Sequence, residues 1–144
     1  MKKKESSYIP LSELSIPAFG YELIREDLLT EILGHDKPDI MYWAGKRLAR
    51  KYPLFTLEEI YEFFINAGWG KLQLVKDGKR TMSFSLTGDL IHHRLQTRTS
   101  YNFRLEAGFL AEQIQQQKKV YAECAEEIDK RNSTIHFLVK WENK

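Results

Sequence analysis

The regular alternation of apolar residues near the C-terminus constrains the fold of this chain more than any other feature. Apolar side chains occupy every second position at Ile135, Phe137, Val139 and Trp141. This period of two predicts a β-strand over 134–141 with one buried face. A preceding strand over 119–127 and a turn over 129–133 complete an antiparallel hairpin. Its apolar face needs a cover, and the apolar stripe of a predicted helix over 102–117 supplies one.

Four more helices are predicted from the spacing of apolar residues and from capping signals. They cover residues 21–33, residues 38–51, a segment that begins after Thr56, and a short segment over 87–95 that Thr87 caps. Thr56-Leu57-Glu58-Glu59 is a capping box, in which the Thr56 hydroxyl accepts from the Glu59 amide and the Glu59 carboxylate accepts from the Thr56 amide. The helix after Thr56 is apolar nearly all round, so we expect it at the centre of the molecule.

A further hairpin is predicted between residues 71 and 86. A two-residue turn would place apolar residues opposite polar ones on each face of this hairpin. A three-residue loop over 76–78 pairs Leu72 with Met82 instead. We therefore predict a type I turn with a glycine bulge, in which Gly78 is left-handed.

The predicted elements are three helices, a hairpin, one or two helices, and a second hairpin. This order predicts an α+β fold, a small antiparallel sheet of two hairpins with several helices packed on one face. A chain of 144 residues fits one domain, which we assign to residues 18–144. Residues 1–17, rich in lysine and serine, are predicted to form an N-terminal tail.

The charge balance excludes several function classes. The 22 basic and 20 acidic residues give a net charge of +2, which is too balanced to indicate nucleic acid or an anionic membrane as a partner. No segment is apolar enough for insertion into a membrane. The single cysteine fits a reducing compartment, and we expect a cytoplasmic protein.

The motifs of common enzymes and metal sites are missing from the sequence. No HExxH or CxxC pattern occurs, and the adjacent His92 and His93 point to different sides of a helix, so no metal and no cofactor are expected. No phosphate-binding glycine loop or nucleophile elbow is present, and we expect a protein that is not an enzyme. Cys124 is best explained as a buried, inert thiol, because a nucleophile would need a base or a cation beside it.

Two other groups of residues have an ordinary and a functional interpretation. Lys46, Arg47, Arg50 and Lys51 form a basic cluster on one helix, which is interpreted first as a solvated face and otherwise as a contact for anions or phospholipids. The aromatic residues either fill a core or line a pocket for an apolar ligand between helices and sheet. The residues expected to line that pocket are Tyr61, Phe64, Trp69, Phe84, Phe109 and Cys124.

Several segments resemble the YslB family of uncharacterised proteins from Bacillus-type bacteria. They are Ile16-Pro17-Ala18-Phe19-Gly20-Tyr21, Tyr42-Trp43-Ala44-Gly45-Lys46 and Phe63-Phe64-Ile65-Asn66-Ala67-Gly68-Trp69-Gly70. More distantly, Ala107-Gly108-Phe109-Leu110-Ala111 and Glu123-Cys124 are similar to the vinyl-reductase-type ligand-binding domain, which also occurs in phenol-sensing regulators and in small TRAPP subunits. This resemblance implies a TRAPP-subunit-like fold, a dimer packed through helices and an apolar ligand in an internal cavity.

The chain departs from the metal-binding versions of that fold. Phe103 and Ile135 stand where those versions have cysteines, and only Cys124 matches. A zinc site is therefore not expected. The cysteine that carries a lipid in some TRAPP subunits also has no counterpart, so acylation is not expected either.

Together, these features predict a binding module that forms a homodimer through its N-terminal helices and can hold an apolar small molecule. Either the helix with Leu23, Leu28 and Ile32 or the helix with Trp43 and Leu48 supplies the dimer face. The alternative is a ligand-free scaffold for protein–protein interaction. An enzyme that acts on a small aromatic substrate through Tyr61, His92 or Cys124 is the least favoured hypothesis.

Overall fold

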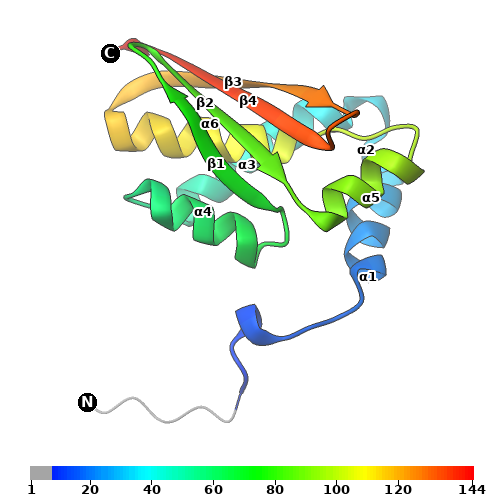
Figure 1. Cartoon of the computed structure of the whole chain (residues 1–144). Helices are drawn as coiled ribbons and strands as arrows, with labels where there is room; N and C mark the ends of the chain where they lie inside the picture. The colour runs from blue at the N-terminus through cyan, green and yellow to red at the C-terminus, as the bar shows by residue number, and fades with distance from the viewer. Residues whose placement is uncertain (1–7) are drawn as a thin grey trace.

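The computed structural model describes residues 8–144 and contains one four-stranded antiparallel sheet (Figure 1). Its strands are β1 (Lys71–Asp77), β2 (Thr81–Thr87), β3 (Val120–Asp129) and β4 (Thr134–Asn143). They lie in the order β1-β2-β4-β3, so the first and last hairpins meet at their second strands. The hairpin predicted from the C-terminal alternation is confirmed.

The helices are α1 (Ala18–Glu22), α2 (Leu29–Leu33), α3 (Lys37–Lys51), α4 (Leu57–Asn66), α5 (Asp89–Thr97) and α6 (Arg104–Lys118). Two of them, α4 and α6, pack against one face of the sheet, and α3 packs on α6 (Figure 1). A π-helical segment, η2 (Leu23–Leu28), joins α1 to α2, and short 3₁₀ turns cover Leu11–Glu13 and Gly34–Asp36. The predicted α+β fold is confirmed. Residues 1–7 of the predicted tail lie outside the described residues.

Apolar cross-strand pairs form the inner face of the sheet. Phe84 on β2 lies opposite Phe137 on β4, and Leu86 lies opposite Ile135. All four side chains are buried. Each pair removes two side chains from water and fixes the register, because a shift by one residue would turn both strands over.

α6 is the central helix of the molecule. It contacts β3 and β4 on one side and α3 on the other, and every residue from Glu106 to Ile114 is buried. The prediction that the helix after Thr56 lies at the centre is wrong. α4 buries only Ile60 and Phe64, and its Ile65 is exposed.

The first hairpin differs from its predicted register. Leu72 pairs with Leu86, not with Met82, and Leu74 pairs with Phe84. A β-bulge between Leu74 and Lys76 leaves Val75 as an extra residue facing solvent. Apolar residues lie opposite each other up to the bulge, and beyond it Asp77 lies opposite Met82. Gly78 is not left-handed.

Candidate functional site

The helical segment over residues 18–33 is oriented inside out. Glu22, Arg25 and Glu26 are buried on its inner side. Globular proteins almost never bury such residues without partners, and an ordinary surface helix turns its apolar side inward. The π-helical turn over Leu23–Leu28 lies within this segment, and π-helical turns often occur at functional sites.

Arg25 connects this segment to the central helix. Its Nη2 donates to Glu106 Oε1 on α6 at 2.7 Å, and its Nη1 donates to the Tyr21 hydroxyl at 2.9 Å. Its Nε donates to Glu26 Oε2 at 3.2 Å. Burial alone would lower the pKa of Arg25, but the carboxylate of Glu106 raises that pKa above its ordinary value, so the guanidinium stays charged.

Arg94 connects the same segment to α5. Its Nε and Nη2 donate to the two carboxylate oxygens of Glu22 at 3.1 and 2.6 Å, which is the fork geometry that arginine makes with carboxylates. Glu26 lies 3.6 Å from Arg94 and 3.9 Å from the Lys37 ammonium. Burial disfavours the charge of Glu22, but Arg94, together with the more distant charges of Arg98 and Arg25, outweighs this effect and lowers the Glu22 pKa below its ordinary value.

These groups form one cluster, which we call the buried ion network. Its members are Glu22, Arg25, Glu26, Lys37, Arg94 and Glu106. Its three carboxylates and three cations balance in charge, and Arg98 joins the edge of the network 3.5 Å from Glu22 while it pairs with Asp27 at 2.9 Å. The fully buried Phe103 ring lies 6.0 Å from the Arg25 guanidinium and 5.3 Å from that of Arg94, which adds cation–π contacts to the network.

The opposite side of the same segment is apolar and faces solvent. We call it the outer apolar face: Phe19, Leu23, Ile24, Leu28 and Ile32. Their exposed fractions run from 45% at Leu23 to 72% at Phe19. Large contiguous apolar surfaces are rare on monomeric proteins and mark sites of interaction.

Of the six predicted pocket residues, three lie together. Phe64, Trp69 and Phe109 contact each other as rings, and Phe63 joins them. The closest centroids, those of Phe63 and Phe109, are 4.5 Å apart. Rings at these distances pack stacked or edge to face, and they fill the space between α4 and α6.

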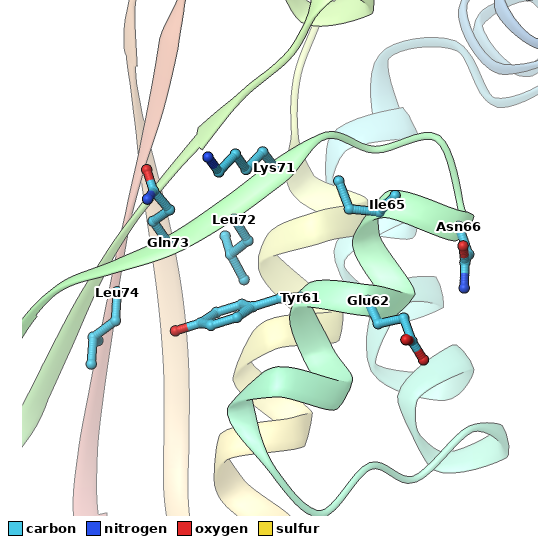
Figure 2. A pocket seen from close by; sticks show the side chains of 8 residues that line it. All are labelled: Tyr61, Glu62, Ile65, Asn66, Lys71, Leu72, Gln73 and Leu74. Carbon is cyan, nitrogen blue, oxygen red and sulfur yellow. The ribbon is translucent and has the colours of Figure 1, made fainter.

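The other three predicted pocket residues lie apart from this ring cluster. Tyr61 lines an open groove of about 780 Å³ between α4 and the edge strand β1, together with Ile65, Leu72 and Leu74 (Figure 2). Phe84 lies in the middle of the sheet, opposite Phe137. Cys124 is buried on β3, and burial raises the pKa of its thiol well above the ordinary value, which leaves the thiol protonated and unreactive.

No metal centre is present in the described part of the chain. Among residues 8–144, no group of three or more histidine, cysteine, aspartate and glutamate side chains is placed to hold a metal ion. His92 Nδ1 instead lies 2.6 Å from the Ser133 hydroxyl and ties α5 to the last turn. None of the helices in the same range is long and apolar enough to cross a bilayer.

The buried ion network was not predicted from the sequence. Its signal is present in the spacing, because Glu22, Arg25 and Glu26 share one helical face just as the apolar residues share the other. The sequence does not say which face turns inward. Only the positions of Arg94 and Glu106 decide this, and both lie within segments predicted only as helices.

The four-stranded antiparallel sheet with helices on one face defines a class of α+β domain. A vinyl-4-reductase family protein from Methanocaldococcus jannaschii has this fold: the superposition has a TM-score of 0.64 at 17% sequence identity and covers 92% of this chain and 87% of that one. The family described as a protein of unknown function (DUF2507) matches residues 18–140. The uncharacterised protein YslB of Bacillus subtilis (strain 168) is 46% identical over 145 residues, covering all of this chain and 98% of that protein. The chain therefore belongs to the DUF2507 family, as its resemblance to YslB predicted.

Proposed function

We propose that this protein is a non-enzymatic binding module that acts as a homodimer through its outer apolar face. The observation that carries this proposal is the inside-out orientation of residues 18–33. The segment buries Glu22, Arg25 and Glu26 and leaves five large apolar side chains in water. Exposed apolar surface of this kind is stabilised when a partner removes it from solvent.

A second copy of the chain is the partner that fits this surface best. A two-fold dimer brings the same face of both copies together, so an apolar face needs only an apolar face opposite it. The alternative dimer face, around Trp43 on α3, carries several cations that would meet their own copies across a two-fold axis. Like charges placed opposite each other disfavour such an interface.

The ring contacts favour a ligand-free scaffold over a module that holds an apolar small molecule. The rings of Phe64, Trp69 and Phe109 pack against one another, with 4.9 to 6.0 Å between their centroids. A ligand among them would have to displace at least one ring. Native mass spectrometry of protein purified from its own host tests this choice: bare chain mass is expected, and a reproducible extra mass of lipid or aromatic size contradicts it.

We propose that the protein is located in the cytoplasm. Cys124, which is the single cysteine of the sequence, is a free thiol. Proteins with unpaired thiols suit a reducing compartment.

Sedimentation analysis of a Leu28→Glu variant tests the dimer. The wild-type protein is expected to sediment as a dimer. Leu28→Glu places a carboxylate of each copy in the apolar interface, and we expect the dissociation constant to rise by a factor of roughly 100 or more. Because Leu28 is half-exposed in the single chain, the variant is expected to keep its fold, which circular dichroism checks.

Ile65→Glu is the matched control for this experiment. Ile65 is also an exposed aliphatic residue on a helix, but it lies on α4, beside the groove of Figure 2. This variant is expected to remain dimeric. A monomeric wild-type protein, or a dimer that Ile65→Glu disrupts and Leu28→Glu does not, would overturn the proposed interface.

A further inference from the structure

A stripe of cations and aromatic rings runs along the exposed side of α3 and remains unexplained by the proposed dimer. We call it the cationic stripe: Trp43, Arg47, Arg50, Lys51 and Tyr52. Trp43 is 59% exposed, although tryptophan is usually mostly buried. The residues at 43, 47, 50 and 51 follow helical spacing, so they share one face.

Two of the three cations of this stripe, Arg47 and Lys51, have no carboxylate partner among residues 8–144. The Arg47 guanidinium lies 5.6 Å from the centre of the Trp43 ring, and the Lys51 ammonium lies 5.8 Å from that of Tyr52. Arg50, by contrast, donates to Glu112 on α6 while half of its side chain stays exposed. Arg47 and Lys51 are therefore charges available to an external anion.

The balanced composition of the chain hides this local asymmetry. The net charge of +2 is distributed so that many cations already face carboxylates, as Lys46 faces Glu123 at 2.7 Å. A local field depends on where the unpaired charges gather, not on the total. In the stripe, two unpaired cations, Arg47 and Lys51, lie beside the rings of Trp43 and Tyr52.

We propose that the cationic stripe binds the surface of a membrane that contains anionic phospholipids. Lysine and arginine near such a surface are attracted by the lipid phosphates and carboxylates. Tryptophan and tyrosine rings have an apolar body and a polar edge, and they settle at the level of the headgroups. A helix with this composition lies on the membrane rather than through it.

Nucleic acid is the other polyanion that the charges could attract, but the exposed surface favours lipid. Nucleic-acid-binding domains usually present a broad basic patch and a strongly basic sequence. Here the stripe is confined to one side of one helix, and Asp39 lies on the same exposed side near its start. Exposed tryptophan and tyrosine rings beside the cations instead favour the headgroup level of a membrane.

Co-sedimentation of the full chain with lipid vesicles tests the proposal. Binding is expected to vesicles of equal parts phosphatidylserine and phosphatidylcholine, to weaken as salt is added, and to be absent on pure phosphatidylcholine. The double variant Arg47→Gln/Lys51→Gln is expected to bind roughly 30-fold more weakly, because each cation near an anionic surface contributes about fivefold. Trp43→Phe is expected to remove the blue shift of tryptophan emission on binding.

Lys76→Gln/Lys79→Gln is the matched control. It removes two exposed lysines from the first hairpin, on another part of the surface, and is expected to bind like the wild-type protein. Equal binding to both vesicle types, equal loss in the two double variants, or binding to a single-stranded DNA oligonucleotide but not to vesicles would overturn the proposal. Circular dichroism confirms that each variant is folded, since all four lysine and arginine positions are exposed.

Discussion

Gly45 and Gly108 set the distance between α3 and α6 at the scale of single residues. A methyl group built on Gly108 would lie 2.0 Å from the Tyr42 carbonyl oxygen, and one on Gly45 would lie 2.2 Å from that of Leu105. Both clashes are with backbone, which cannot rotate away. The two helices are therefore in backbone contact, and this contact lets α6 fit between α3 and the sheet.

Replacing Gly108 by alanine is expected to destabilise the protein. Alanine has the better helix propensity by about 1 kcal/mol, but the overpacking forces α3 and α6 apart and costs about 1–3 kcal/mol or more. Gly20→Ala is the control, because nothing lies within 4 Å of its added methyl group and the position is helical. Urea unfolding should show a lower midpoint for Gly108→Ala and an unchanged or higher one for Gly20→Ala. Equal midpoints would contradict backbone contact.

Helix capping was predicted correctly from the sequence only where the capping side chain had a single hydrogen-bond partner within reach. Thr56 accepts from the Glu59 amide at 3.1 Å, as predicted. The Glu59 carboxylate, however, accepts from the amide of Phe55 and not from that of Thr56. The predicted cap at Thr87 is wrong, because Gly88 precedes α5 and no side chain caps the helix. Gly88 occupies the N-cap position at which the Thr87 hydroxyl was expected.

At the scale of elements, periodicity predicted the position of nearly every helix and strand but not how deeply each one is buried. The C-terminal hairpin was predicted correctly from a period of two, because alternate side chains of a strand without a bulge all point to the same face. The first hairpin was placed in the wrong register, since a bulge at Val75 changes the faces midway along β1. α4 was expected at the centre on its composition, but α6, whose glycine permits close approach, occupies it.

Buried ion pairs hold the segment over residues 18–33 against the rest of the molecule, and a double-mutant cycle measures their contribution to stability. Arg25→Met removes the only hydrogen-bond donor that Glu106 has among residues 8–144, since Glu106 Oε2 has no partner there. A carboxylate left buried and unpaired costs about 3–5 kcal/mol. Glu106→Leu is expected to cost less, because Arg25 keeps Glu26 and Tyr21.

The double variant Arg25→Met/Glu106→Leu completes the cycle. With both charges replaced by apolar groups, stability is expected to recover to well above that of Arg25→Met alone, which gives a coupling free energy of about 2 kcal/mol or more. Urea unfolding measures the four free energies. Costs that simply add would mean that the two side chains do not depend on each other, and the ion network would then not be the element that holds the segment.

At the scale of the whole molecule, the sequence predicted the fold class and family but not which surfaces remain open. Leu23, Leu28 and Ile32 were expected to form an apolar face, and they do. Whether that face turns inward depends on Arg94 and Glu106, which lie about 70 and 80 residues further along the chain. Long-range ion pairs leave no periodic signal, so the inside-out orientation became visible only in three dimensions.

The dimer proposed for that open face has a consequence for heat stability. When unfolding separates two chains, the melting temperature rises with protein concentration, because mass action favours the assembled state. For chains of this size the rise is expected to be roughly 2 °C for each tenfold increase in concentration. Leu28→Glu should melt lower and at a temperature independent of concentration, whereas Ile65→Glu should keep the wild-type slope. Calorimetry at several concentrations measures both, and a flat wild-type profile would mean that the outer apolar face stays uncovered by a second copy.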